Sequence, residues 1–314
     1  MVKSRFSSER LAVVGLGLMG GSLALAMQPH VGTIVGVDTD ALTRDYALKQ
    51  GIVDEATADL RAAVHDADTV VLAAPVREVL DILRNRIGSY LRSNTLLIDL
   101  GSTKVDICEA MGRLPIGVHA IGGHPMTGKE RSGIQSSDQE LYVGAPFVLC
   151  QTRRMTPATR LRALAFVETL GAVPIEMDAV RHDRVVATIS HLPYLLSAAL
   201  MATAGKEGDA DEAVWQLAAG GFRDMTRLMG SDIRMMSDIT STNTQAIAVL
   251  LAHFRVQLAL LETMLIARDE EQLANALAPL RDRRLHWEQH YLNHRQNGHA
   301  PMQVEREDQV QESE

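Results

Sequence analysis

The chain has 314 residues, which is long enough to bury a large hydrophobic core, so one large or two medium domains are expected. Its apolar fraction of 46% is ordinary for a globular protein. A formal net charge of −8 argues against a surface for nucleic acid or for an anionic membrane, because either would need a basic patch.

The cysteine content and the terminal sequences exclude further classes. The two cysteines, Cys108 and Cys150, belong to no CxxC pair, so we expect neither a disulfide framework nor a metal site. A reducing cytoplasm fits this composition. We expect no membrane span, because no apolar run looks long and uninterrupted enough, and the N-terminus lacks the apolar core of a signal peptide.

Residues 11–27 read LAVVGLGLMGGSLALAM, which predicts a buried strand, a glycine-rich turn and a helix. Gly15 permits the tight turn, Gly17 lets a pyrophosphate approach the backbone, and Gly20 lets the helix pack closely on the strand. The helix N-terminus would offer free N–H groups and a positive dipole end to the phosphates. A glycine-rich turn in some other α/β protein is the alternative. The cofactor-binding residues predicted here are Gly15, Gly17, Leu18, Met19 and Gly20.

An acidic residue follows the next predicted strand, residues 33–37. Asp38 stands 18 residues past Gly20, where a carboxylate accepts hydrogen bonds from the adenosine ribose hydroxyls. The same charge would repel a 2′-phosphate, so the sequence favours NAD over NADP. The nearby Arg44 could weaken this preference.

Apolar strands alternate with helical segments as far as residue 176, which predicts an α/β Rossmann-type dinucleotide-binding domain over residues 10–176. Because ligand sites lie at the carboxyl ends of such strands, we expect Ala74 and Pro75 to line the cofactor pocket. The further strands are predicted at residues 69–74, 95–100, 118–121, 146–149 and 172–175, and helices at residues 41–50 and 76–87.

Two predicted loops after strands carry candidate catalytic side chains. The hydroxyl of Ser102 could cap the following helix or project towards the nicotinamide and substrate, and position alone leaves both open. His124 follows two glycines and precedes Pro125, which predicts a stiff loop. A histidine there is suited to act as a general base, because its ordinary pKa lies near neutrality. A surface histidine in a turn is the alternative, and the neighbouring dinucleotide site favours the base.

Strand signals end near residue 177, and residues 177–297 are predicted to form an all-α domain. His191 interrupts an apolar stretch that Pro193 would kink, and a buried core histidine is the usual interpretation of such a residue. Arg223 and Arg227 follow a glycine pair. An arginine in an apolar pocket could bind a carboxylate in a bidentate manner, and a surface salt bridge is an equally good interpretation.

The stretch at residues 241–268 is apolar on most faces. Such a helix must be buried within its domain or against another subunit, so we predict a homodimer through the helical domain. A monomeric helical core is the alternative. Residues 1–9 are predicted to be a disordered lead-in, and the acidic residues 298–314 a disordered tail.

Five motifs occur in this order: VVGLGLMGGS, DLGSTK, GGHPMTGKERSG, HDRVVATISHLPY and GGFRDMTRL. With them the chain resembles the prephenate/arogenate dehydrogenases of tyrosine biosynthesis, often called the TyrA family, from residue 10 to about residue 297. The resemblance implies a Rossmann domain followed by a helical dimerisation domain. It also implies NAD-dependent oxidative decarboxylation of prephenate to 4-hydroxyphenylpyruvate, or of arogenate to tyrosine as the alternative.

The same resemblance assigns roles to individual residues. His124 corresponds to the catalytic histidine that accepts the hydrogen bond of the ring hydroxyl, and Ser102 to the serine that bonds the same hydroxyl. Arg227 corresponds to an arginine that binds a substrate carboxylate, and His191 to a histidine near the substrate side chain. Gly220 opens the last motif and is counted with the substrate-binding residues.

Two other functions compete with this one. The GLGLMG sequence also suits a β-hydroxyacid dehydrogenase of the 3-hydroxyisobutyrate type, which usually relies on a catalytic lysine in its helical part. Here Lys206 is the only lysine after Lys129, and it lies in the polar segment GKEGDAD. A catalytically silent NAD-binding module is the other alternative, and it would have no need of His124, Ser102 and Arg227 together.

Overall fold

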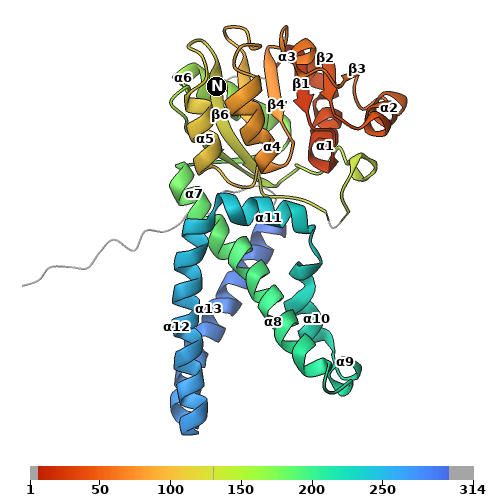
Figure 1. Ribbon diagram of the computed structural model, residues 1–314. Helices are drawn as coiled ribbons and strands as arrows, with labels where there is room; N and C mark the ends of the chain where they lie inside the picture. The colour runs from red at the N-terminus through yellow and green to blue at the C-terminus, as the bar shows by residue number, and fades with distance from the viewer. Residues whose placement is uncertain (1–5, 130, 297–314) are drawn as a thin grey trace, which may run out of the picture. The chain divides into compact units, whose positions relative to one another are not determined.

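The structure is a computed structural model that describes residues 6–129 and 131–296. The chain divides into two compact units, Met1–Phe254 and Arg255–Glu314. The larger unit contains a sheet domain and the helices that directly follow it (Figure 1).

Eight strands form one sheet in the order β3-β2-β1-β4-β5-β6-β7-β8. Neighbouring strands from β3 to β6 are parallel, β7 is antiparallel to β6, and β8 is parallel to β7. This is the doubly wound order, in which ligands bind where the strand order reverses beside β1. The strands are β1 Ser8–Val14, β2 Val31–Val37, β3 Glu55–Thr57, β4 Thr69–Leu72, β5 Leu96–Asp99, β6 His119–Pro125, β7 Pro146–Cys150 and β8 Val173–Met177.

Helices cover both faces of the sheet, and alternate strand residues pack on opposite faces. Leu11 and Val13 belong to the core that includes α1 and α6, whereas Ala12 and Val14 belong to the core that includes α3, α4 and α5. Burial on both faces explains why these strands are apolar throughout. The helices of this domain are α1 Leu18–Met27, α2 Ala41–Lys49, α3 Leu60–Val64, α4 Val76–Asp81, α5 Val105–Gly112 and α6 Pro157–Thr169, with short 3₁₀ turns at Gln28–His30 and Ile134–Ser136.

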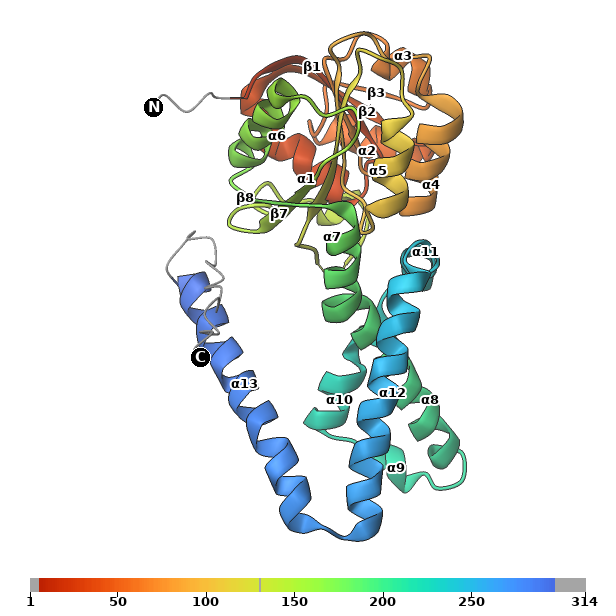
Figure 2. The ribbon, with the colours of Figure 1, turned by 90° about the vertical axis from the view of Figure 1, so that its left-hand side faces the viewer.

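After β8 the described residues are helical. Helix α7 leads away from the sheet domain into α8, and α11 returns to lie beside α4 (Figures 1 and 2). There Arg77 donates to Ser241 Oγ at 3.2 Å and forms an ion pair with Asp238. These helices are α7 Ala179–Val186, α8 Leu192–Gly208, α9 Ala213–Gln216, α10 Gly220–Thr226, α11 Ile233–Thr242 and α12 Thr244–Ala267, with a 3₁₀ turn at Arg227–Gly230.

The smaller unit begins inside α12. It contains the second part of that helix and α13, Glu270–Gln296. Arg268 takes a left-handed conformation (φ 54°) at the turn between them, and Pro279 lies inside α13.

Strand β6 is longer than predicted, and this changes the setting of His124. We expected a strand at residues 118–121 and a loop after it. Instead, residues 122–125 continue the strand by pairing with β7 in the antiparallel direction. Glycine-rich sequence usually indicates a loop, but this pairing with a distant segment has no local signal. His124 is therefore a strand residue.

The N-terminal prediction also differs from the structure. Strand β1 begins at Ser8, and Phe6 is buried with its ring edge-on to Phe166 at 5.2 Å between centroids. The lead-in expected at residues 1–9 is thus ordered from Phe6 onward. Residues 1–5 and the predicted tail at residues 298–314 lie outside the described residues.

Two predicted helices contain π-helical turns. The helix expected at residues 76–87 is α4 followed by a π-helical turn at Ile82–Arg86. The kink expected at Pro193 takes the form of a π-helical turn at Ala187–His191, after which α8 begins. Proline lacks an N–H and clashes with the carbonyl four residues earlier, and a wider turn accommodates both effects.

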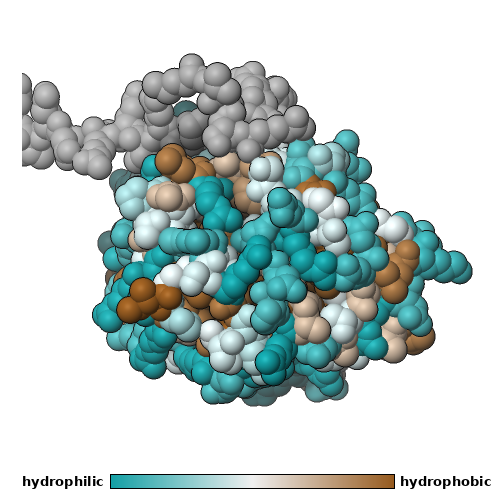
Figure 3. All heavy atoms as spheres, turned by 90° about the horizontal axis from the view of Figure 1, so that it is seen from above, coloured by the Kyte–Doolittle hydropathy of each residue, from teal (hydrophilic) through white to brown (hydrophobic). Residues whose placement is uncertain are grey.

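Two helical stretches, Ala179–Gly208 and Thr244–Ala267, are long and apolar enough to cross a membrane by length and composition alone. Our expectation that no such run exists was therefore wrong. Along α12, which is described throughout, the only buried residue is Ile247. An exposed apolar surface of this kind is typical of a contact with another protein or with a membrane. The outer end of the sheet domain, by contrast, is mainly hydrophilic (Figure 3).

Candidate active site

In the glycine-rich turn after β1, two glycines lie so close to other backbone atoms that a side chain would not fit. Gly15 has φ of 98°, and a Cβ there would lie 2.8 Å from the backbone of Ala73. A Cβ on Gly20 would lie 1.9 Å from the carbonyl oxygen of Gly15. Both positions therefore require glycine.

Gly17 is different, because a Cβ there would meet no atom within 4 Å. Open space thus lies in front of the N-terminus of α1, and Gly17 supplies no side-chain cap to this helix. The N–H groups of the first turn, from Leu18 to Gly20, are available to a bound phosphate. These residues fit the pyrophosphate of a dinucleotide.

Asp38 directly follows β2, beside the glycine turn. Its carboxylate accepts hydrogen bonds from the N–H groups of Leu16 and Asp40, each at 2.9 Å. Arg44 donates instead to the backbone carbonyls of Asp38 and Thr39, at 2.7 and 3.0 Å. The arginine that could have weakened the NAD preference is therefore bonded to the backbone and not to the carboxylate.

Ala74 and Pro75 lie at the carboxyl end of β4, next to the same turn. A Cβ on Gly15 would lie 2.9 Å from the backbone nitrogen of Ala74. Pro75 is the N-cap of α4. Both residues are thus at the edge of the sheet where the cofactor site is expected.

Asp99, the last residue of β5, joins the two segments that carry Ser102 and His124. Its Oδ2 accepts from Gly101 N at 2.8 Å and from Lys104 Nζ, and its Oδ1 accepts from Gly123 N at 3.0 Å. The Asp99 and Lys104 side chains are fully buried. Ser102 and His124 each directly follow a glycine that is fixed to this carboxylate.

His124 is the first member of a chain of hydrogen bonds. Its Nδ1 lies 2.8 Å from Nε2 of His182, and Nδ1 of His182 lies 2.7 Å from Oδ1 of Asp183. His182 and Asp183 are buried on α7, while His124 is only partly buried. A substrate can therefore reach His124, but not the two residues behind it.

The surroundings of His124 keep it neutral. Burial among protein atoms lowers the pKa of His124 well below its ordinary value, and the neighbouring His182, Lys104 and His191 lower it further. A neutral imidazole can accept a proton, whereas an imidazolium cannot. This environment is suitable for a general base.

His191 lies close to the same network. Its Nδ1 is 3.2 Å from Nδ2 of Asn243, which also donates to the backbone carbonyl of Asp183 at 2.7 Å. Burial lowers the pKa of His191 to about 4, so this ring is also neutral at physiological pH. His191 is thus buried and hydrogen-bonded, as in the interpretation of this residue as a core histidine, and it also lies near His124.

Ser102 does not cap α5. The N-cap is Lys104, which makes no side-chain cap hydrogen bond. Instead, the carboxylate of Asp183 accepts from Lys104 N at 2.7 Å and from Val105 N at 2.9 Å. Ser102 remains half-buried, and its hydroxyl forms no hydrogen bond with any described residue.

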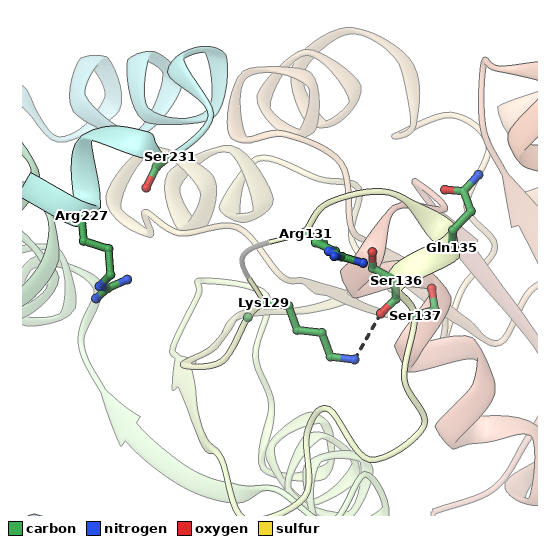
Figure 4. A pocket seen from close by; sticks show the side chains of 8 residues that line it. Lys129, Arg131, Gln135, Ser136, Ser137, Arg227 and Ser231 are labelled. Carbon is green, nitrogen blue, oxygen red and sulfur yellow. Dashed lines mark hydrogen bonds between the residues drawn. The ribbon is translucent and has the colours of Figure 1, made fainter. Parts of the chain in front are cut away.

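Arg227 lines a cationic pocket of about 780 Å³, and His124 is not among its lining residues. Figure 4 shows Arg227 and Ser231 on one side and the side chains of the loop before β7 on the other. Lys129 is paired with Asp138 at 2.9 Å and also donates to the carbonyl of Ser136. Arg131 and Arg227 form no ion pair with any described residue. The lining residues are Gly128, Lys129, Arg131, Gln135, Ser136, Ser137, Arg227 and Ser231.

Gly220 and Arg223 lie outside these contacts. Gly220 is the exposed first residue of α10, and a Cβ there would meet nothing within 4 Å. Arg223 is exposed and paired with Asp224, which matches the surface salt bridge considered from sequence.

Five residues of this site were not predicted from the sequence: Asp99, Lys104, His182, Asp183 and Asn243. The adjacent His182 and Asp183 stand at the start of the HDRVVATISHLPY motif, and this adjacency was the available signal. Nothing in the local sequence shows that their side chains would meet His124, which is 58 residues away in the chain.

Two family models match the chain. Residues 23–176 match the nucleotide-binding domain of prephenate dehydrogenase, and residues 178–279 match its dimerization domain. Together these matches cover most of the chain and both parts of the fold.

The chain is also similar to individual dehydrogenases. Prephenate dehydrogenase of Lactococcus lactis is 32% identical over 84% of this chain and 73% of its own length. Cyclohexadienyl dehydrogenase of Zymomonas mobilis is also 32% identical, over 84% of this chain and 91% of its own. The crystal structure of Aquifex aeolicus prephenate dehydrogenase in complex with hydroxyphenyl propionate and NAD⁺ aligns over 90% of this chain and 99% of its own, with a TM-score of 0.82 and 28% identity.

Proposed function

The chain belongs to the prephenate dehydrogenase family, and we propose that it converts prephenate to 4-hydroxyphenylpyruvate by NAD-dependent oxidative decarboxylation. This reaction belongs to tyrosine biosynthesis. The proposal rests mainly on His124, which is a neutral and only partly buried histidine at the end of a buried chain of hydrogen bonds. A catalytically silent NAD-binding module would not need such a base.

The chain is an NAD-dependent oxidoreductase. The α1 N-terminus with Gly15, Gly17 and Gly20 would hold the pyrophosphate, and Asp38 the adenosine ribose. Ala74 and Pro75 would line the same pocket. When bound, NAD supplies the hydride acceptor for the ring carbon that bears the substrate hydroxyl.

His124 acts as the general base of this reaction. Loss of hydride from the hydroxyl-bearing carbon develops a carbonyl, so the hydroxyl proton must leave. His124 accepts it, and Ser102 bonds the same hydroxyl. The ring carboxylate then leaves as carbon dioxide and the ring becomes aromatic. This gain of aromaticity makes the free energy of the reaction strongly favourable. The protein therefore mainly orients the reactants and receives one proton.

Arg227 binds a substrate carboxylate. It shares its pocket with Lys129 and Arg131, and this positive charge suits a dianionic substrate. His191 and Gly220 would lie near the substrate side chain.

Arogenate is the second candidate substrate, because it differs from prephenate only in an amino group in place of the side-chain keto group. The similarity to a cyclohexadienyl dehydrogenase keeps it under consideration. A β-hydroxyacid substrate is not favoured, since the family matches cover both domains and the helical part has only Lys206 as a lysine.

We further propose that the chain is a homodimer in the cytoplasm. The match to a dimerization domain covers α12, whose apolar side chains are largely exposed. Both cysteines are unpaired and buried, which suits a reducing compartment. No nucleic acid is expected as a partner of a chain with net charge −8.

Steady-state rates of NADH formation with prephenate and with arogenate, each with NAD and NADP, test the proposal. We expect the highest kcat/KM with prephenate and NAD. A preference for arogenate would keep the chemistry and change the substrate. Absence of turnover with all four pairs would contradict the proposed function.

A further inference from the structure

We propose that His182 and Asp183 hold His124 in the tautomer that carries its hydrogen on Nδ1, so that Nε2 is free to accept the substrate proton. Both act as positioning residues, because neither touches the substrate. The inference deepens the proposed function by explaining how the base is prepared for it.

The carboxylate of Asp183 is surrounded by hydrogen-bond donors. It accepts from Lys104 N at 2.7 Å, from Val105 N at 2.9 Å and from the His182 ring at 2.7 Å. Two of these donors are the first free N–H groups of α5, and a helix N-terminus favours a negative charge. An ionised carboxylate can only accept hydrogen bonds, so the His182 nitrogen that faces it must donate.

The position of the hydrogen on His182 in turn determines which nitrogen of His124 carries a hydrogen. When the His182 ring carries a single hydrogen and that hydrogen is on Nδ1, its Nε2 has a lone pair. That atom lies 2.8 Å from His124 Nδ1, which must therefore donate. The two rings meet edge to face, with centroids 5.0 Å apart, and His182 is fully buried, so no solvent competes for this bond.

Because Nδ1 of His124 carries the hydrogen, the opposite ring nitrogen, Nε2, carries none. A neutral histidine without a partner carries its hydrogen mainly on Nε2, which would block the base. The chain of bonds reverses this preference. When Nε2 accepts the hydroxyl proton, His124 becomes an imidazolium whose Nδ1–H still donates to His182, and the Asp183 carboxylate behind it offsets the new charge. The charged or titratable groups around this ring are His182, Asp183, Lys104 and His191.

The tautomer can be observed directly by two-bond ¹H–¹⁵N correlation NMR on the full-length enzyme labelled with ¹⁵N-histidine, with NAD bound. The measurement is made at about pH 8, where histidine is neutral. A spectrum of His124→Asn identifies the His124 signals. We expect the Nδ1–H tautomer in the wild type, and the Nε2–H tautomer of His124 would overturn the proposal. This readout does not depend on which substrate the enzyme turns over, so it can succeed or fail independently of the proposed function.

Two substitutions separate positioning from simple packing. His182→Gln keeps an acceptor oxygen near the position of Nε2 and should retain the Nδ1–H tautomer of His124. His182→Phe keeps a ring but offers no acceptor, so His124 should revert to Nε2–H. We expect kcat of this variant to fall roughly 10- to 100-fold with little change in KM, because a general base contributes about 10²- to 10⁴-fold and its partner only orients it.

A matched control lies on the same strand. His119 is bonded to Thr159 and Asn94 and lies at the start of β6, so His119→Gln should leave the His124 signals and kcat unchanged. A His182→Phe enzyme with a lowered melting temperature but unchanged tautomer and kcat would show that His182 only packs, and would overturn the proposal. If this variant does not fold, the wild-type and His182→Gln spectra still decide the question.

Discussion

His124 owes its chemical character to neighbours from two segments, the start of α5 and the helical stretch Ala179–Gly208. Lys104, His182 and His191 all lower its pKa in addition to burial, so the ring stays neutral where an ordinary histidine begins to charge. The neutral form is the active base. Protonation on the acid side is therefore the event that should stop the reaction.

The pH dependence of kcat/KM follows from this direction. Because the pKa of His124 is lowered well below 6.5, kcat/KM should stay constant from higher pH down through about 6.5 and fall only at more acidic pH. The measurement is a pH series of initial rates, with enzyme stability checked at each value. An acid limb centred at or above pH 6.5 would contradict this account of the site.

Asp38 should control the choice of cofactor. In Asp38→Asn, loss of the charge removes repulsion of a 2′-phosphate and weakens the hydrogen bonds to the ribose, which are worth about 1.5–3 kcal/mol when charge-assisted. The ratio of kcat/KM for NADP to that for NAD should rise about 10-fold or more. Asp40→Asn is the control, since Asp40 caps α2 and is not expected to bind the ribose. A ratio that stays the same in Asp38→Asn would argue against the assigned role.

At the level of elements, the Asp99–Lys104 pair holds β5, β6 and the start of α5 together. Removing one partner of a fully buried pair leaves an uncompensated charge. Lys104→Met should therefore lower the free energy of unfolding by about 3–5 kcal/mol in urea titrations. Arg113→Gln breaks an exposed pair with Glu109 and should cost no more than about 0.5 kcal/mol. A Lys104→Met protein as stable as this control would refute the structural role of the pair.

The elements also show what the sequence could predict. The glycine turn, Asp38 and most strands depend on local patterns, and the structure contains them at or near the predicted positions. The antiparallel pairing of β6 with β7 and the contact of His124 with His182 depend on segments far apart in the chain. Such pairings leave no periodic signal, so the strand setting of His124 and its two partners were missed.

At the scale of the whole molecule, α12 is the feature that a single chain leaves exposed. Val256, Leu258, Leu265 and Ile266 are each at least half exposed. The exposed apolar length suits a helix that packs against a second copy of the chain.

Light scattering after size-exclusion chromatography should give a mass close to twice the 34.3 kDa of one chain. Leu258→Glu combined with Leu265→Glu places two charges seven residues apart on one face of α12 and should shift the protein towards monomer. Leu42→Glu, on an exposed helix of the sheet domain, should remain dimeric. A monomeric wild type, or recovery of the chain only with membranes, would contradict the dimer.

In the proposed function, His124 is the base of an NAD-dependent oxidative decarboxylation. The most direct test measures NADH, carbon dioxide and 4-hydroxyphenylpyruvate together, with prephenate and NAD, for the wild type and for His124→Asn. We predict equal amounts of the three products from the wild type, and a rate lowered by about 10²- to 10⁴-fold in the variant while NAD binding persists. Unequal products, or a variant that turns over at the wild-type rate, would contradict the account.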